Sequence, residues 1–207
     1  MKAKLGLPIL LMVVFALTRF PGLMPPNFSA VYGLLFCAGV YFTGALAWWL
    51  PLATMAVTDL AICSYYQARG VDAFQWHMLI NYLGYAALIA FGRRFKPQSS
   101  LLALLGGGVL GAILFYLITN TAAWLFNPFH NPEYTQTLAG WITALTKGTA
   151  GYPPTVEFFR STLLSGGLFT GLFAGAMKLG EALEPKEEPE EAAAEEPSEG
   201  EPEEAKA

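Results

Sequence analysis

The sequence predicts an all-α, polytopic membrane protein with six transmembrane helices and a disordered acidic C-terminal tail. Its 207 residues are 54% hydrophobic and only 14% charged, whereas a soluble domain carries roughly 25% charged residues. The charges are also segregated, because residues 181–207 hold 12 of the 16 acidic residues. The rest of the chain contains six apolar stretches, each approaching the roughly 20 residues that cross a hydrocarbon layer.

This segregation divides the chain into two predicted domains. Residues 1–180 carry ten basic and four acidic residues, a net charge of +6, and are expected to form the transmembrane domain. Residues 181–207 carry a net charge of −10 and consist mainly of Glu, Ala and Pro, so they bury too little apolar surface to fold. We expect this cytoplasmic tail to be a solubilising extension, with regulation or partner binding as the alternative.

The first apolar stretch, residues 5–18, is short and follows Lys2 and Lys4. A charged start before a short apolar run is also typical of a signal peptide, which needs a small-residue cleavage site. Residues 16–21 read Ala-Leu-Thr-Arg-Phe-Pro, which is a poor cleavage site. We therefore interpret the stretch as a retained first helix.

The next two stretches, residues 29–45 and 47–65, almost touch, so the chain must turn tightly around residues 44–51. They contain the two cysteines of the chain, Cys37 and Cys63. Two thiols are too few for a disulfide framework or a metal site. We expect both to pack as small buried hydrophobic residues.

The last three stretches are residues 76–91, 100–119 and 158–179. The fifth and sixth are joined by residues 120–157, a connection long enough to be a candidate for function. Within it, residues 135–147 are amphipathic. This segment predicts a short interfacial helix that caps the outer mouth of the bundle.

Basic residues orient the predicted helices, because cytoplasmic loops of membrane proteins are enriched in Lys and Arg. With six spans, three basic positions fall on one face: Lys2 and Lys4 before the first helix, Arg93, Arg94 and Lys96 between the fourth and fifth, and Lys178 at the end of the sixth. The sequence thus predicts a multi-pass protein of the cell (inner) membrane, embedded in the lipid bilayer with both termini in the cytoplasm. The outer face then receives the loops at residues 19–28, 66–75 and 120–157.

Glycines at i, i+4 spacing mark one face on each of two predicted helices. Gly167, Gly171 and Gly175 lie in the sixth helix, and Gly107 and Gly111 lie in the fifth. Small residues let another helix approach closely within a membrane. These faces are either internal packing surfaces or a docking face for a separate membrane subunit, and the spacing fits both.

Asp59 is the only acidic residue inside an apolar stretch, and a charge inside a membrane is costly enough to indicate a function. The third helix runs outward, which places Asp59 in its outer half. An unpaired carboxylate there would protonate or seek a cation. Arg19 and Arg160, at the outer ends of the first and sixth helices, are the candidate partners. A structural salt bridge and a contact with a ligand or ion both remain open.

Further polar and aromatic groups gather at the predicted outer ends of the helices: Asn27, His77, Asn81, Asn120 and Trp124. His77 and Asn81 are four residues apart and share a helix face. No nucleophile motif, metal-ligand spacing or phosphate loop accompanies these groups. We therefore expect neither an enzyme nor a bound metal or cofactor, and no nucleic-acid partner.

Several short motifs then occur in a defined order: Pro25-Pro26-Asn27-Phe28-Ser29, Gly39-Val40-Tyr41-Phe42, Pro51-Leu52-Ala53, Thr58-Asp59-Leu60, Thr119-Asn120 with Trp124, and Phe158-Phe159-Arg160-Ser161-Thr162-Leu163-Leu164. Over residues 19–176 the chain resembles the uncharacterised DUF6580 family, whose members are regarded as transport proteins. The resemblance marks five positions as family motif residues: Asn27, Asp59, Asn120, Trp124 and Arg160. The chain departs from the family pattern in lacking a basic cluster at residues 43–49 and an acidic residue at Gly166-Gly167.

The layout of the family is similar to that of the S components of energy-coupling-factor transporters, which have six helices and an outward-facing substrate pocket. This similarity implies a substrate-binding subunit for uptake of a small molecule, working with a membrane coupling subunit and ATPase subunits. On this interpretation the site is lined by Asp59, Arg160, Asn120, Asn81 and Trp124. The alternative is a structural or accessory subunit of a membrane complex, without a ligand of its own.

Overall fold

A computed structural model describes residues 6–71 and 78–183 of the chain. These residues form helices and connections and contain no strand, which confirms the predicted all-α class. The helices are α1 (Gly6–Thr18), α2 (Val31–Tyr41), α3 (Leu46–Gln67), α4 (Met78–Gly92), α5 (Leu101–Phe126), α6 (Leu138–Thr146) and α7 (Thr155–Leu183). His77, Lys2, Lys4 and the predicted tail from residue 184 onward lie outside the described residues.

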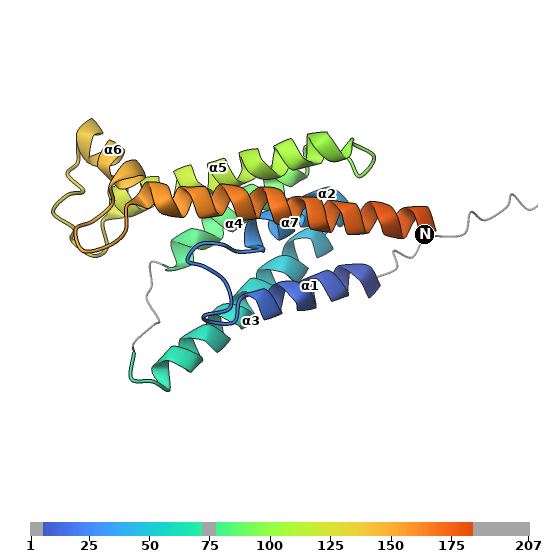
Figure 1. Cartoon of the computed structure of the whole chain (residues 1–207), viewed down its shortest axis with the longest axis horizontal. Coiled ribbons are helices and arrows are strands. Elements are labelled where there is room, and N and C mark those ends of the chain that lie inside the picture. Colours follow the sequence, from blue (N-terminus) through green and yellow to red (C-terminus); the bar gives the residue numbers. More distant parts are fainter. Residues whose placement is uncertain (1–5, 72–77, 184–207) are drawn as a thin grey trace, which may run out of the picture.

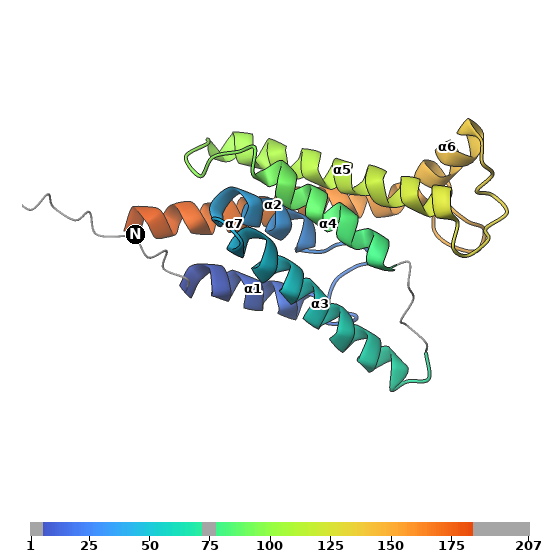
Figure 2. The same cartoon turned by 180° about the vertical axis from the view of Figure 1, so that it is seen from behind.

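Six of these helices run along the long axis of the molecule, and α6 lies beyond one end of them (Figure 1). Residues 127–154 lie at this end, which is called the α6 end below, and residues 19–30 join the ends of α1 and α2 that point toward it. Residues 42–45, residues 93–100 and the last turn of α7 lie at the opposite end (Figure 2). Loops that the sequence assigns to one side of the membrane therefore gather at one end of the bundle.

The shortest of the six long-axis helices, α2, occupies the centre of the bundle. Ten of its eleven residues are buried, and it packs against α1, α3, α4, α5 and α7. A helix that is apolar on every side needs neighbours or lipid all around it. The five neighbouring helices surround α2, so its apolar surface is covered by protein. The length of α2 therefore does not have to match the thickness of a membrane.

Glycines allow the closest helix contacts around α2. Gly39 of α2 and Gly92 of α4 face each other, and a Cβ on Gly39 would clash with the carbonyl oxygen of Ile89. On the other side of α2, a Cβ on Gly33 would lie 2.5 Å from the backbone nitrogen of Thr170 in α7. At these two crossings the helix backbones themselves are in contact, as small residues permit.

Most of the glycines that the sequence singled out face neighbouring helices of the same chain. A Cβ on Gly107 would lie 2.5 Å from the Phe36 ring, and one on Gly111 would lie 3.0 Å from Leu88. On α7, a Cβ on Gly167 would lie 3.4 Å from Val109 and one on Gly171 would lie 3.1 Å from Leu105. Only at the fifth of these positions, Gly175, would a Cβ meet no described atom within 4 Å. Docking of another subunit remains a prediction.

Helix α5 extends beyond its predicted end at residue 119 and reaches Phe126. The polar residues that suggested an end there instead bond within the helix: Thr119 Oγ1 donates to the carbonyl of Phe115 (2.9 Å), and Asn120 Nδ2 donates to that of Tyr116 (2.9 Å). The helix stops at Asn127, which has a left-handed φ of 37° and precedes a proline. The long connection therefore spans residues 127–154.

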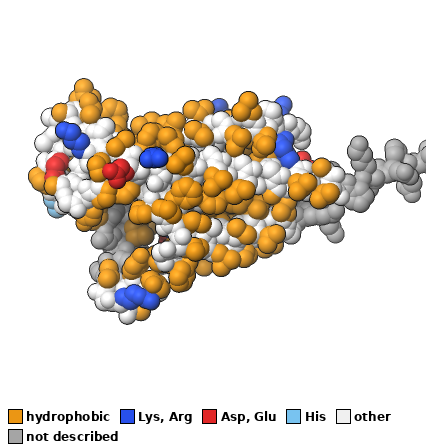
Figure 3. Space-filling view, viewed as in Figure 1, with side chains coloured by type: hydrophobic (Ala, Val, Ile, Leu, Met, Phe, Trp, Pro, Cys, Tyr) orange, Lys and Arg blue, Asp and Glu red, His pale blue; other side chains and the backbone are white. Residues whose placement is uncertain are grey.

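Among the described residues, three helices, α3, α5 and α7, are long and apolar enough, by length and composition, to cross a membrane. The surface agrees with this property, because hydrophobic side chains cover the flank seen in Figure 3 and charged groups gather near the ends. On α7, Leu164, Leu168 and Leu172 are all at least half exposed. A stripe of exposed leucines on a long helix is compatible with a lipid-facing surface.

Candidate functional site

Residues 19–30, the α1–α2 loop, lead from the end of α1 to the buried start of α2. Asn27 in this loop has a φ of 58°, a left-handed conformation that asparagine adopts more readily than most residues. The backbone N–H of Val31 donates to Ser29 Oγ (3.2 Å), which fixes the entry into α2. The loop thereby holds Asn27 over the centre of the bundle.

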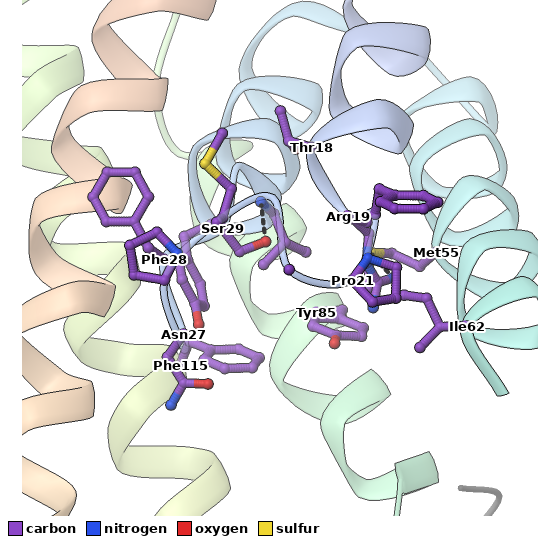
Figure 4. Close-up of a pocket in the computed structure, with 16 residues that line it drawn as sticks. Thr18, Arg19, Pro21, Asn27, Phe28, Ser29, Met55, Ile62, Tyr85 and Phe115 are labelled. Atoms are coloured by element: carbon purple, nitrogen blue, oxygen red, sulfur yellow. Dashed lines mark hydrogen bonds between the residues drawn. The ribbon is translucent and has the colours of Figure 1, made fainter. Parts of the chain in front are cut away.

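Two cavities lie beside this loop, and each has a volume of about 270 Å³. The first is bordered by the α1–α2 loop, α2, α3, α4 and α5 (Figure 4). The second is bordered by α2, α4, α5 and the start of α7. Four residues line both: Asn27, Tyr32, Tyr85 and Phe115. The cavities therefore adjoin each other.

Three aromatic rings form the border between the two cavities and are called the aromatic wall. The rings of Tyr85 and Phe115 are stacked, with centroids 5.5 Å apart and planes only 8° apart. Tyr32 packs against Phe115 at 5.1 Å with its plane tilted by 59°. Tyr32, Tyr85 and Phe115 come from α2, α4 and α5, so the wall also ties these three helices together.

Side-chain amides face the second cavity. Asn81 of α4 and Asn120 of α5 line it together with Thr119 and with Asn27 of the α1–α2 loop. Asn120 uses its Nδ2 to donate to the carbonyl of Tyr116, which turns its Oδ1 outward as an acceptor. Within the described part of the chain, the side-chain amides of Asn27 and Asn81 have no hydrogen-bond partner, so both remain able to bind a ligand.

A third cavity, called the loop cavity, adjoins the second and has a volume of about 420 Å³. It is bordered by residues 127–154, the α6 loop, and shares Asn120, Thr155 and Phe158 with the second cavity. Tyr134 also lines it, and burial together with the nearby Glu133 carboxylate raises the pKa of its phenol. The loop cavity thus connects the site with the surface of the α6 end.

The α6 loop is anchored to α5 by side-chain hydrogen bonds. The indole N–H of Trp124 donates to the carbonyl of Thr135 (2.7 Å), and Gln136 Nε2 donates back to the carbonyl of Trp124 (3.0 Å). The indole N–H of Trp141, in α6, donates to Thr121 Oγ1 (2.9 Å). These bonds hold α6 in place over the end of the bundle.

Arg19 and Asp59 form a salt bridge in which Arg19 Nη2 donates to Asp59 Oδ1 at 2.6 Å. The hydroxyl of Tyr82, on α4, donates to the other carboxylate oxygen at 2.8 Å. Arg19 Nη1 also donates to Thr58 Oγ1 at 2.8 Å. Because both charged side chains are only about 15% exposed, this network links the end of α1 to α3 and α4 with both charges satisfied.

The network separates Asp59 from the two adjoining cavities. Arg19 lines the first cavity, whereas Asp59 faces a different, largely apolar space of about 290 Å³ between α3 and α4, shared with Cys63 and Tyr82.

Both cysteines are free thiols, and only Cys37 is buried. No three His, Cys, Asp or Glu side chains gather as a metal site in residues 6–71 and 78–183.

The model of one protein family matches residues 1–187 of the sequence. The chain belongs to DUF6580, a family of unknown function. No curated protein and no solved structure matches the chain. Membership confirms the family resemblance seen in the sequence motifs, and it extends over more of the chain than those motifs do.

The DUF6580 motif residues fall into four separate places in the structure. Asn27 and Asn120 line the second cavity. Asp59 is engaged by Arg19, and Trp124 anchors the α6 loop. Arg160 is exposed on α7 and borders none of the cavities described above, so the pairing left open in the sequence is made with Arg19.

Sequence reasoning did not identify the aromatic wall of this DUF6580 protein. Tyr32, Tyr85 and Phe115 lie within apolar stretches, where an aromatic residue is equally expected in a helix core or at a membrane interface. Their shared position depends on how α2, α4 and α5 cross. The sequence nonetheless contained one indication of this site. The hydroxyls of Tyr32 and Tyr85 lie inside predicted spans, where a polar group needs a hydrogen-bond partner or water.

Proposed function

We propose that this DUF6580 protein binds a small molecule at the α6 end and acts as the substrate-binding subunit of an uptake system. The observation that carries the proposal is the pair of adjoining cavities, in which the amides of Asn27 and Asn81, which have no partner among the described residues, lie beside an aromatic wall. Polar groups within a membrane protein are costly unless they are used. Concave sites that combine aromatic side chains with a few convergent polar groups are typical of small-molecule binding.

The membrane arrangement in this proposal has six spans. Besides α3, α5 and α7, the apolar helices α1, α2 and α4 run along the same axis. Exposed side chains on α1, including Leu10 and Leu17 at 57% and 64% exposure, favour contact with lipid.

Charge suggests which end faces outward. Arg93, Arg94, Lys96 and Lys178 lie at the end opposite α6, and Lys2 and Lys4 precede α1 in the sequence. Four basic residues lie on the α6 side: Arg19, Arg69, Lys147 and Arg160. Because cytoplasmic loops are enriched in Lys and Arg, six against four favours an outward-facing α6 end. Both termini would then be cytoplasmic, as the sequence predicts.

Cysteine labelling tests this orientation. In a chain lacking Cys37 and Cys63, Thr149→Cys lies in the α6 loop and Ser99→Cys lies at the opposite end. A membrane-impermeant maleimide should label Thr149→Cys in intact cells and Ser99→Cys only after permeabilisation. Labelling of Ser99→Cys alone in intact cells would place the cavities on the cytoplasmic side and contradict uptake from outside.

Uptake against a gradient requires energy, which we assign to separate subunits. The similarity in layout to S components suggests a membrane coupling subunit and ATPase subunits as partners. Gly175, where a side chain would meet no described atom within 4 Å, is a position at which such a subunit could approach. No catalytic step is assigned to this chain.

Ligand retention tests the proposal directly. The full chain, purified in detergent, is dialysed against a cellular metabolite extract, and retained compounds are identified by mass spectrometry. Asn81→Trp should block the second cavity, because Asn81 lines it. Leu83→Trp is the matched control, since Leu83 lies on the same helix and is 65% exposed.

A compound retained by the wild-type chain and Leu83→Trp, but lost from Asn81→Trp, supports a substrate-binding subunit. If all three chains retain the same compounds, or none, the cavities are not a binding site. The alternative of an accessory subunit without a ligand would then account for the protein.

A further inference from the structure

The charge of the cavity lining restricts which ligand fits. The described residues that line the second cavity include no charged side chain. Among those that line the first cavity, the only charged group is Arg19, and its charge is balanced by Asp59 at 2.6 Å. A charged ligand would lose part of its hydration without gaining an unpaired opposite charge, which is unfavourable.

The aromatic wall favours a flat ligand. Phe115 and Tyr85 already stack with nearly parallel planes, and both border the two cavities. A third ring can extend such an arrangement by offset stacking or by an edge contact. An aliphatic chain would fill the same space without this geometric preference.

The amides supply the edge contacts that a heteroaromatic ring requires. Asn27 and Asn81 each offer a donor and an acceptor without a partner in the described part of the chain, and Asn120 offers its Oδ1. A side-chain amide bonds in a planar, paired manner to a ring edge that carries both a carbonyl and an N–H group. Three amides around one cavity favour several such edges over a pure hydrocarbon.

The size of the cavities agrees with this chemistry. A cavity of about 150 Å³ accommodates benzene, and each cavity here measures about 270 Å³. One cavity is therefore large enough for a compound of one or two rings. A substituent on that compound can extend past the aromatic wall into the adjoining cavity. Larger drug-sized molecules generally occupy pockets of about 300–1,000 Å³.

From these four properties we infer that the ligand is an uncharged heteroaromatic compound of one or two rings that carries adjacent carbonyl and N–H groups. The inference rests on the proposed function and names its substrate class. The ring stacks against the aromatic wall, and its polar edge forms hydrogen bonds with Asn27, Asn81 and Asn120.

The test uses matched neutral and charged probes. An equimolar mixture of uracil and orotate, and of nicotinamide and nicotinate, is added to the metabolite extract before dialysis of the full chain in detergent. Phe115→Leu removes the stacking ring while keeping an apolar side chain. Phe91→Leu is its matched control, because Phe91 packs against Phe36 and Phe95 and lines neither cavity.

We expect the retained compounds to be neutral heteroaromatic molecules, and Phe115→Leu to weaken their retention by roughly two- to tenfold. Phe91→Leu should leave retention unchanged. Specific retention of a carboxylate, a phosphate or a cation would overturn the neutral class while leaving the substrate-binding function intact. Retention of a neutral compound without a ring would overturn the heteroaromatic class, and equal retention by Phe115→Leu and wild type would overturn stacking on the aromatic wall. If nothing is retained, the proposed function fails, and this inference fails with it.

Discussion

Replacing Asp59 by Leu tests whether the Arg19 salt bridge holds the helices together. The substitution removes the 2.6 Å bond from Arg19 and the 2.8 Å bond from Tyr82. Hydrogen bonds to a charged group contribute about 1.5–3 kcal/mol each. The side chains are about 15% exposed, so a value near the lower limit applies to each bond, giving a loss of about 3 kcal/mol, in the range seen when a buried pair loses one partner.

The double variant separates attraction from desolvation. Asp59→Leu leaves Arg19 without its counter-charge, and Arg19→Leu leaves the carboxylate with only Tyr82. Replacing both removes each uncompensated charge, and apolar pairs often substitute for buried ion pairs at little cost. We therefore expect the double variant to lose no more than about 1 kcal/mol, so that the coupling energy between the two sites exceeds about 2 kcal/mol.

SDS-induced unfolding of the purified chain in mixed micelles measures these free energies. Glu157→Leu serves as the control, because Glu157 is an exposed carboxylate in the first turn of α7 and its removal should cost less than about 1 kcal/mol. If Asp59→Leu is no more destabilising than Glu157→Leu, the bridge does not stabilise the fold. Additive losses in the double variant would show that Arg19 and Asp59 act independently.

Three further predictions follow from individual contacts. Gly39→Leu should abolish the folded peak in size-exclusion chromatography because its side chain would clash with the α4 backbone, whereas Gly175→Leu should leave the peak unchanged because a Cβ at this position meets no described atom within 4 Å. Trp124→Phe removes the 2.7 Å indole hydrogen bond to the α6 loop, worth about 1 kcal/mol, and should raise hydrogen exchange in that loop several-fold but not in α2. Burial and the Glu133 carboxylate raise the folded-state pKa of Tyr134 above its ordinary value of 10.0. This stabilisation is complete below pH 10 and lost as pH rises through the folded-state pKa, so Tyr134→Phe should show a smaller fall in unfolding temperature between pH 9 and pH 11.

The order of the helices was predictable because apolar length leaves a direct trace in the sequence. The helices confirm it, since the segment at residues 135–147 contains α6, and each predicted stretch that the structure describes contains a helix. The predicted end of α5 at residue 119 was wrong, because the polar residues Thr119 and Asn120 interrupt the apolar stretch and so indicate a boundary. Both bond to carbonyls one turn earlier, which satisfies them inside the helix. Asn127 before Pro128 is the better stop signal.

Contacts between distant helices were less predictable than the helices themselves. Asp59 required a cation, yet the sequence did not distinguish Arg19 from Arg160. Arg19 lies at the end of the first predicted helix and Arg160 at the start of the sixth, both on the predicted outer side. The choice depends on α1 packing against α3, which no local pattern encodes. The tight crossing of Gly39 and Gly92 was missed because neither glycine has a second glycine four residues away in its own helix.

The position of the cavities follows from the unequal lengths of the central and outer helices. At 1.5 Å per residue, the eleven residues of α2 extend about 16 Å, while the 26 residues of α5 extend about 39 Å. Gly39 and Gly92 fix α2 close to the end opposite α6, so the axis of the bundle near α6 contains no central helix. The α1–α2 loop fills part of this space, and Tyr32, at the start of α2, forms its floor. The hollow is therefore a property of the backbone, so truncating a single lining side chain enlarges it, and only an added bulky side chain, such as Asn81→Trp, can close it.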